Sequence, residues 1–581
     1  MAKKLINLTI DGVKVSVEEG STILDAAKVA GIKIPTLCYL KDLNPIGACR
    51  MCLVEATGAR GLVAACVYPV TEGMVVITNS DKVIKARKTN LELLLSNHRK
   101  NCSDCLKAND CKLKQYAELY LASETNYAGK KSLNPLDNSS DCIIRDPSKC
   151  ILCKRCSAVC QSQQAVGVIH ANKRGFDSYI GCAYGETLDK TACVGCGQCT
   201  LVCPTGALTE KNDADKVFAA LANPELTVVV SPAPSVRVAL GEEFGYPIGT
   251  DVEGKMVSAF RRLGFKYVFD VDFAADLTIM EEGYEFLDRL QHGGKLPLIT
   301  SCSPGWVNFA TAYYPDMIGN LSTAKSPMGM EGSCIKTYWA EKMNIPAEKI
   351  FVVHVMPCTA KKSERLFESK SKGDLYDTDA VLTVRELARM LKQKGIDLRK
   401  LPEGKFDDPL GESTGAGVIF GTTGGVMEAA LRTVADILTG QDLQEIEYKK
   451  VRGTKGIKEA TLNIAGKEVN ICVVSGLANA KKVLDDVKAG RKQYHFIEIM
   501  CCPGGCVNGG GMPYVDYNEI SREEVCKLRA KALYKNDENK QYRKSHKNPS
   551  IIKIYKEYFE KPNSHKAHEI LHRSYKQRKF I

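Results

Sequence analysis

Apolar and polar residues alternate in two short segments near the N-terminus, residues 5–10 and 13–17. Alternation with a period of two predicts half-buried strands, and the dipeptide Asp11-Gly12 between them is a strong hairpin signal. The next segment, Thr22 to Ala30, has helical spacing and stops at Gly31, a residue type that commonly follows the end of a helix. The first part of the chain is therefore expected to form a small α+β unit.

From about residue 225 the pattern changes to short, continuous apolar runs, each followed by an amphipathic stretch. Such runs are typical of buried strands, and their alternation with helices predicts a layered α/β domain. The predicted strands are 227–231, 266–271, 296–300, 350–356, 416–421, 469–474 and 496–500. A helical segment is expected at the C-terminal end, and no run reaches the roughly 18 to 20 apolar residues that a membrane span requires.

Length and composition narrow the class of protein. The 581 residues predict roughly three to five domains, and 44% hydrophobic with 25% charged residues is ordinary for a soluble globular protein. The 25 cysteines matter more: no secretory signal is seen, and thiols in a reducing cytoplasm indicate metal ligands. The net charge of +12 does not indicate nucleic-acid binding, because no basic run with interleaved aromatic residues accompanies it.

An internal duplication repeats the spacing C-x2-C-x2-C-x3-C. Its two copies are Cys150, Cys153, Cys156 and Cys160, and Cys193, Cys196, Cys199 and Cys203. In two-cluster bacterial ferredoxins with this spacing, three thiolates hold one 4Fe4S cluster and the fourth reaches across to the other cluster. Structural zinc is the alternative, but zinc sites rarely use a run with a shared, crossed-over ligand.

Two further sets of candidate ligands precede the duplication. The first set is Cys38, Cys49, Cys52 and Cys66; its central C-x2-C and distant fourth cysteine favour a 2Fe2S cluster over zinc. The second set follows the helical stretch Lys85 to Ser96 and consists of His98, Cys102, Cys105 and Cys111. It favours a 4Fe4S cluster in which a neutral imidazole replaces one thiolate and raises the reduction potential. The alternative for His98 is an ordinary surface or core histidine.

Three cysteine motifs in the second half of the chain follow predicted strands. Their cysteines are Cys302, Cys358, Cys502 and Cys506. Loops at the carboxyl ends of strands assemble sites in α/β domains, so these thiols are expected to converge, although each alone could be a buried free thiol. Glycines at 504, 505 and 509–511 allow close backbone approach to a bulky cofactor. Glu282, Glu285 and Arg289 share one helix face, a pattern that usually marks a solvated surface.

The order of these motifs resembles the iron-only (FeFe) hydrogenases. A 2Fe2S domain, a site of one histidine and three cysteines, and a duplicated ferredoxin occur together in clostridial-type members and in the catalytic subunits of NAD(P)-linked ones. The first two modules also resemble the large iron-sulfur subunit of respiratory complex I. The motifs TSCSPGW, MPCTAKK and MCCPGGCVNGGG resemble the three hydrogenase signatures, and the similarity continues from about Ala233 to Arg573.

The resemblance implies an H-cluster, in which a 4Fe4S cubane shares one cysteine with a diiron unit that carries CO, cyanide and azadithiolate. It implies that Cys358, Cys502 and Cys506 hold the cubane and that Cys506 bridges to the diiron unit. Glu282, Ser322 and Glu285 match the family's proton route. The positions that match its contacts to the diiron unit are Ala233, Pro234, Ser235, Pro327, Met356, Lys361, Phe420 and Met500.

The first signature departs from the family pattern. Many members carry two adjacent cysteines before Pro-Gly-Trp, the first relaying protons and the second binding the cubane, whereas this chain has Cys302-Ser303. In strict register Cys302 is the relay and Ser303 an unusual metal ligand; a shift of one residue makes Cys302 the ligand instead. A thiolate suits iron better than a hydroxyl, and both readings stay open. Met328 replaces a polar donor of many relatives, and Cys501 replaces an alanine.

Taken together, these features predict a cytoplasmic, anaerobic hydrogenase that interconverts dihydrogen with protons and electrons. No dinucleotide fingerprint is seen, so the expected electron partners are ferredoxin or flavin- and NAD(P)-binding subunits, and diiron maturation enzymes would complete the active site. The alternatives are a non-catalytic electron-transfer subunit, an iron-sulfur assembly factor and a hydrogen sensor. The expected modules are a 2Fe2S ferredoxin-like domain at 1–79, a His-ligated 4Fe4S domain at 80–120, a linker at 121–141, a two-cluster ferredoxin domain at 142–212, a catalytic domain at 220–520 and a small-subunit-like segment at 521–581.

Overall fold

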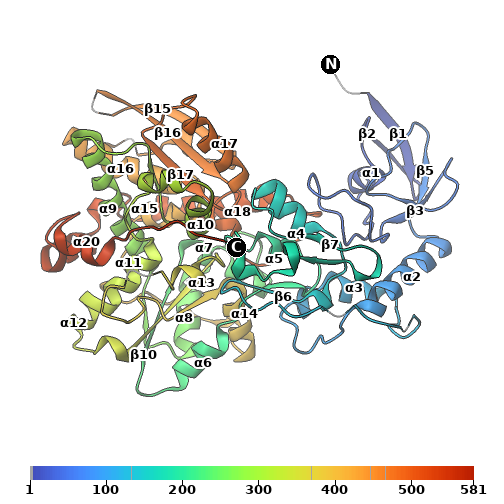
Figure 1. Cartoon of the computed structure of the whole chain (residues 1–581), viewed down its shortest axis with the longest axis horizontal. Coiled ribbons are helices and arrows are strands. Elements are labelled where there is room, and N and C mark those ends of the chain that lie inside the picture. The colour runs from blue at the N-terminus through green and yellow to red at the C-terminus, as the bar shows by residue number, and fades with distance from the viewer. Residues whose placement is uncertain are drawn as a thin grey trace.

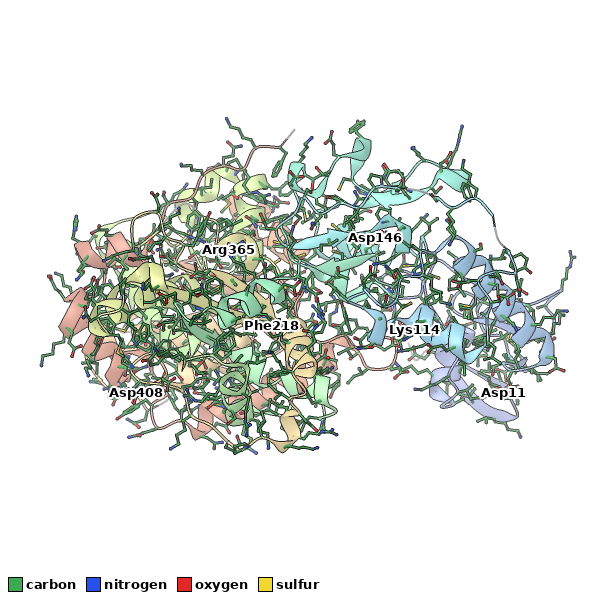
Figure 2. The ribbon with its side chains drawn as sticks, turned by 90° about the horizontal axis from the view of Figure 1, so that it is seen from below. Asp11, Lys114, Asp146, Phe218, Arg365 and Asp408 are labelled. Carbon is green, nitrogen blue, oxygen red and sulfur yellow. The ribbon has the colours of Figure 1, made fainter. Side chains whose placement is uncertain are left out.

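The computed structural model describes residues 4–127, 129–132, 134–367, 370–444, 446–464 and 466–580. The molecule is elongated, with the N-terminal modules at one end, a small cysteine-rich module next to them and a larger α/β body at the other end (Figure 1). Asp11 and Lys114 lie toward one end, Asp146 is intermediate and Asp408 lies near the opposite end (Figure 2). Among the described residues, no helix is both long and apolar enough to cross a membrane.

A five-stranded sheet, in the order β2-β1-β5-β3-β4, forms the N-terminal module. Its strands are β1 Leu5–Ile10, β2 Val13–Glu18, β3 Leu53–Ala56, β4 Val63–Ala64 and β5 Val75–Ile77. β1 and β2 pair antiparallel across Asp11 and Gly12, both with positive φ, so the predicted hairpin is confirmed. Helix α1 (Ile23–Val29) begins with a capping box in which Thr22 and Asp25 bond each other's backbone N–H.

Helices α2 (Asp81–Asn97) and α3 (Lys112–Leu119) form the second module. α2 extends beyond the predicted stretch at both ends, and His98 is its C-terminal cap. Leu91, Leu95 and Leu113 share a buried core with cysteines of the modules on either side, Cys38 and Cys153. The described residues of 121–141 contain no helix or strand, in keeping with a linker.

The duplicated cysteine motifs fold into duplicated local structure. Strands β6 (Ile143–Arg145) and β9 (Leu208–Glu210) pair antiparallel, as do β7 (His170–Asn172) and β8 (Tyr179–Gly181). Short helices α4 (Arg155–Ala158) and α5 (Gln198–Val202) follow the second cysteine of each motif, and both begin after a left-handed residue, Lys154 or Gly197. The sequence repeat is therefore also a structural repeat.

Two four-stranded sheets lie in the larger α/β body, in the orders β11-β10-β13-β14 and β12-β17-β16-β15. All the pairings are parallel except that of β15 with β16. The strands are β10 Thr227–Pro232, β11 Tyr267–Val268, β12 Leu298–Ile299, β13 Ile350–Met356, β14 Ala380–Thr383, β15 Ile457–Ile464, β16 Lys467–Ser475 and β17 Phe496–Met500. β14 and β15 were not predicted, because β14 is only four residues long and β15 is largely polar.

The 22-residue helix α9 (Val271–His292) contributes to the cores beside both sheets. Phe273 packs in one core with Val352 of the first sheet. Phe286 stacks on Phe496 of the second sheet, with ring centroids 4.9 Å apart. Because α9 is anchored in both cores, the carboxylates that it carries have fixed positions between the two sheets.

The remaining helices cover the sheets and build the C-terminal segment. Those of the larger α/β body are α6 Ala214–Ala222, α7 Pro234–Arg237, α8 Glu253–Leu263, α10 Pro304–Tyr313, α11 Pro327–Cys334, α12 Ala340–Lys342, α13 Lys361–Glu364, α14 Val384–Gln393, α15 Gly415–Val418, α16 Gly425–Thr439 and α17 Leu477–Lys488. The predicted helical tail is confirmed as α18 Arg522–Asn539, α19 Pro549–Ile554 and α20 His565–Leu571.

The predicted strand at 416–421 is wrong. The segment forms helix α15 and a following 3-10 turn, Ile419–Gly421. Thr414 caps the helix by accepting a hydrogen bond from the backbone N–H of Ala416. Gly417 lies so close to α9 that a Cβ there would come within 2.4 Å of the Asp272 carbonyl oxygen. Close helix packing through glycine, which an apolar run does not reveal, determines the structure here.

Candidate active site

A cavity lies where strands of both sheets end. β10 leads into Ala233, β12 into Cys302, β13 into Cys358 and β17 into Met500. The cavity is lined by Ala233, Pro234, Ser235, Val271, Cys302, Pro327, Met328, Met356, Pro357, Cys358, Lys361, Phe420, Gly421, Met500 and Cys506. The loops after the strands thus bring the three cysteine motifs together, as the strand-end argument predicts.

All eight positions expected to contact a diiron unit line this cavity. Three other lining residues, Val271, Pro357 and Gly421, were missed. Pro357 and Gly421 are next to predicted residues, so the motifs could have identified them. Nothing in the sequence singles out Val271. The lining is mainly apolar, so a group bound here would be shielded from water.

Of the three thiols expected to hold the cubane, two line the cavity and the third does not. Cys358 and Cys506 line it, and Cys502 is buried. Burial and the neighbouring Cys502 and Cys506 thiols raise the pKa of Cys358. Gly505 adopts a positive φ and packs against Thr423, where a Cβ would come within 2.6 Å of the backbone nitrogen. The glycines therefore allow the loop to fold tightly around the thiols.

The side chains of Cys302 and Ser303 lie in different surroundings. Cys302 lines the cavity, and its pKa is raised by burial and by Glu282, so the thiol keeps its proton. Ser303 occupies the N-cap position of α10, but its hydroxyl instead accepts a hydrogen bond of 3.2 Å from the backbone N–H of Cys501. Ser303 is not among the residues that line the cavity.

Glu282 lies near Cys302, and Ser322, Glu285 and Arg289 are linked to one another by hydrogen bonds. Glu282 is 1% exposed and neither carboxylate oxygen has a hydrogen-bond partner among the described residues. Burial, with a smaller effect of Glu285, raises the pKa of Glu282 to about 8. The Ser322 hydroxyl donates to Glu285 at 2.8 Å, and Arg289 donates to the same carboxylate at 2.6 Å. The alternative of a solvated helix face is wrong for Glu282.

The polar groups of the cavity suit a cofactor that carries hydrogen-bond acceptors. The hydroxyl of Ser235 is buried without a partner among the described residues. The Lys361 ammonium donates to Ser326 at 2.6 Å and forms an ion pair of 2.5 Å with Glu364. A buried, unpaired hydroxyl is costly unless a ligand completes it. Thiols for iron, an apolar wall and this hydroxyl together fit the group that the resemblance implies.

A second cavity lies in the ferredoxin-like module. Its lining includes Cys150, Cys153, Cys156 and Cys203, so the fourth thiol comes from the other motif copy, as the crossed-over pattern predicts. The remaining four are Cys160, Cys193, Cys196 and Cys199. Burial raises the pKa of Cys199, and the neighbouring Cys196, Cys193 and Cys160 thiols raise it further.

The first cysteine set is brought together in two buried pairs. Backbone N–H groups of Cys38 and Cys49 each donate to the other residue's sulfur at 3.4 Å. The Cys52 and Cys66 sulfurs are 3.3 Å apart. Across the described residues, no three His, Cys, Asp or Glu side chains gather around one point as ligands of a single ion.

His98 is buried, and its Nδ1 lacks a hydrogen-bond partner among the residues that the structure describes. Burial is the main cause that lowers the pKa of His98 to about 4, so the ring is neutral at physiological pH, the form that binds metals. Cys105 packs against Gly206, where a Cβ would come within 2.4 Å of its sulfur, and Cys111 accepts a hydrogen bond from Lys114. Cys102, the remaining member of the set, is partly exposed.

Contacts between modules show in which spatial order the cysteine sets lie along the molecule. Asn44 donates to the carbonyls of both Cys38 and Cys153, at 2.7 and 2.9 Å, which joins the first set to the ferredoxin-like module. At the other side, Thr359 donates to the Gly195 carbonyl at 2.6 Å beside the active-site motif. The ferredoxin-like module therefore lies between the N-terminal thiols and the active-site cavity, as the sequence of modules in Figure 1 also shows.

Five family models match the chain. Those of the iron only hydrogenase large subunit, C-terminal domain, and the iron hydrogenase small subunit match residues 226–510 and 523–578. A 2Fe-2S iron-sulfur cluster binding domain matches 3–81, the NADH-ubiquinone oxidoreductase-G iron-sulfur binding region 87–125, and a 4Fe-4S dicluster domain 149–207.

Two curated proteins match the whole chain. The NADP-reducing hydrogenase subunit HndD of Solidesulfovibrio fructosivorans is 48% identical over 588 residues, which cover 99% of this chain and 100% of the relative. Iron hydrogenase 1 of Clostridium pasteurianum is 42% identical over 573 residues, which cover 98% and 100%. A solved FeFe hydrogenase from Chlamydomonas reinhardtii has a TM-score of 0.57 at 39% identity, covering 63% of this chain and 99% of that one.

Proposed function

The chain belongs to the iron-only hydrogenase family, and from this premise we propose that it interconverts dihydrogen with protons and electrons in the cavity between the two sheets. The observation that carries the proposal is the lining of that cavity. Cys302, Cys358, Cys506 and Lys361, each from a family signature, face one space with an apolar wall. A subunit that only transfers electrons has no need of such a cavity, and an assembly factor has no need of a proton path to it.

We assign the cofactors by the thiols that each site supplies. One 2Fe2S cluster would use Cys38, Cys49, Cys52 and Cys66, and one 4Fe4S cluster would use His98, Cys102, Cys105 and Cys111. Two more 4Fe4S clusters would use the duplicated motifs, with Cys203 and Cys160 crossing over. In the H-cluster, Cys358, Cys502 and Cys506 would hold the cubane, with Cys506 shared with the diiron unit. The strict register of the first signature assigns the fourth corner to Ser303, which offers a hydroxyl and no thiol.

When bound, the diiron unit would supply the iron site at which dihydrogen is split or formed. The chain's own residues would exclude water from that site through Pro327, Met356, Phe420 and Met500. Ser235 and Lys361 would hold the cyanide ligands by donating hydrogen bonds, since the Ser235 hydroxyl has no partner among the described residues. Such orientation and drying of a reactive centre is what a protein contributes to cofactor chemistry.

We propose that Cys302 transfers the proton, in line with the strict register of its motif. Its protonated thiol lies in the cavity, and its pKa is raised by burial and by Glu282. From Glu282 the path would continue through the Ser322 hydroxyl, which donates to Glu285. Arg289 holds Glu285 in place at the far end. A carboxyl group with a pKa near 8 can both accept and release a proton close to neutral pH.

Electrons would travel along the length of the molecule. The first set and the His98 set both adjoin the Cys150 cluster, through Asn44 and through Cys105 beside Gly206, so either could receive electrons. We propose flavin- and NAD(P)-binding subunits as partners, because the 48% identical relative is named as a subunit of an NADP-reducing enzyme. Ferredoxin is the other candidate donor, and dedicated enzymes would insert the diiron unit.

The family-model ranges support the proposed modules, whose boundaries are 1–79, 80–120, 121–141, 142–212, 220–520 and 521–581. To test the function, the chain is produced anaerobically with and without diiron maturation enzymes and assayed for dihydrogen uptake with an artificial electron acceptor. Uptake is expected only from the matured protein, because no amino acid supplies carbonyl, cyanide or azadithiolate. Equal uptake by the unmatured protein would refute the site assignment.

A further inference from the structure

The two cluster sites beside the cavity differ in the number of thiols available to them. The nearer ferredoxin-type cluster has four, Cys160, Cys193, Cys196 and Cys199, whereas the active-site cubane has only Cys358, Cys502 and Cys506. A 4Fe4S cubane takes one protein ligand on each iron. One corner of the active-site cubane is therefore without a cysteine from the expected positions.

The hydroxyl of Ser303 is a poor replacement at that corner. Soft iron-sulfur centres prefer thiolate, and a cysteine ionises near pH 8.5, whereas an alcohol holds its proton far more tightly. The oxygen is also engaged, because it accepts the backbone N–H of Cys501 at 3.2 Å. The same hydrogen bond also holds residues 303 and 501 next to each other.

Cys501 places an additional thiol at this corner. It directly follows β17, and the residue is 3% exposed. Its sulfur lies over the first turn of α10, where a Cβ on Gly305 would come within 2.7 Å of it. Gly305 thus leaves the room that the thiol occupies beside the first turn of the ten-residue helix α10.

The neighbours of this thiol are themselves assigned cluster ligands. Cys501 shares a buried cluster with Cys502, which the proposed function assigns to the active-site cubane, and Cys196 of the ferredoxin-type cluster packs against the same cluster. The count of thiols decides between the two sites, because the Cys196 cluster already has its full set of four. The incomplete site is the cubane.

We propose that Cys501 supplies the fourth thiolate of the active-site cubane in place of the Ser303 hydroxyl. The cysteine at 501, where many relatives carry alanine, would take the place of the cysteine that the family pattern expects at 303. The sulfur gives up its proton to solvent and donates an electron pair to the fourth iron, with no change in oxidation state. This inference rests on the proposed function, since it presumes a cubane on Cys358 and Cys502.

The test uses the full chain produced anaerobically without diiron maturation enzymes, so that cubane binding is measured apart from turnover. Iron and sulfide are counted per chain, and the reduced clusters are followed by electron paramagnetic resonance. Cys501→Ala is expected to lose about four irons and one cubane signal, and Ser303→Ala to lose none. In the double variant Cys501→Ala with Ser303→Cys, the iron is expected to return, which a merely misfolded chain would not show.

Controls separate this inference from the proposed function. Cys472 on β16 is an equally buried thiol with no assigned role, so Cys472→Ala should keep all its iron. Cys502→Ala should lose about four irons. If Cys502→Ala loses them while Cys501→Ala keeps them, Cys501 is no ligand and only this inference fails. If neither variant loses iron, no cubane is bound there, and the proposed function fails with it.

Discussion

Glu282 illustrates how a single buried residue can be matched to a proton-transfer task. Its carboxyl group is almost inaccessible and has a pKa of about 8, chiefly because burial disfavours the charged form. The sequence located Glu282 and Glu285 by their helical spacing, but spacing alone pointed to a solvated face. Only the packing of α9 between two cores shows that this face is buried, and packing is a property of the whole fold.

Glu282→Gln should reduce turnover by roughly 100- to 10,000-fold, because an amide can hold the position but cannot exchange the proton. Iron content and cluster spectra should stay as in the parent chain. The matched control is Asp288→Asn, an exposed carboxylate on the same helix, which should leave turnover unchanged. Turnover within twofold of the parent in Glu282→Gln would remove Glu282 from the path.

The same residue predicts a pH dependence of stability. Its pKa rises from 4.5 to about 8 on folding, so between these values the folded chain holds a proton that the unfolded chain has lost. This contribution to stability is fully present below the lower value and is lost as the pH rises through about 8. The unfolding temperature, measured anaerobically, should therefore fall less steeply with rising pH in Glu282→Gln than in the parent chain. Identical slopes for the two proteins would contradict the raised pKa of Glu282.

His98 is predicted to be a cluster ligand, and two substitutions test it. His98→Cys should keep a cluster but lower its potential, on the order of 100 mV, because an anionic thiolate replaces a neutral imidazole. Redox titration followed by electron paramagnetic resonance measures this. His98→Ala should change the spectrum of that cluster. An unchanged spectrum in His98→Ala would mean that His98 is an ordinary buried histidine.

Substitution of Cys302 distinguishes its two possible roles, proton relay and cubane ligand. If it relays protons, Cys302→Ala should keep the active-site cubane and lose activity by roughly 100- to 10,000-fold. If it holds the cubane, the same change should remove about four irons. The relay reading is expected to hold, because Cys302 lines the cavity next to Glu282. Loss of the cubane signal with the other clusters intact would reverse the assignment.

At the scale of elements, the sequence predicted the strands that carry the site better than it predicted their surroundings. Runs such as 350–356 and 496–500 are strongly apolar and end in cysteine motifs, so both strand and site were readable. The run 416–421 has the same apolar character but is helical, because Gly415 and Gly417 let the backbone pack directly against α18 and α9. Local hydrophobicity does not encode such close approach.

Gly417→Ala tests this account of α15. The added methyl would meet the Asp272 backbone oxygen at 2.4 Å, and a backbone atom in the core has little freedom to move. Overpacking of this kind typically costs about 1 to 3 kcal/mol, so a lower anaerobic unfolding temperature is expected. Gly61→Ala, which has open space around it, is the control. Equal unfolding temperatures for the two variants would contradict the packing argument.

Across the whole molecule, the order of modules along the chain becomes an order in space, from β1 at one end to α20 near the other (Figure 1). The sequence predicted the cysteine sets but not that the first two sets both adjoin the Cys150 site. That convergence depends on single contacts such as Asn44 to Cys153, between residues far apart in sequence. The proximity of Ser303 and Cys501 likewise follows from the fold and not from either motif.

The cavity between the two sheets is proposed to hold a diiron unit that carries carbonyl and cyanide. The most direct measurement is the infrared spectrum of the anaerobically matured chain, because those ligands vibrate where protein groups do not absorb. Carbonyl and cyanide bands are expected that change under dihydrogen and are absent from Cys506→Ala matured in the same way. Matured protein with its iron-sulfur clusters in place but without such bands would contradict this proposal.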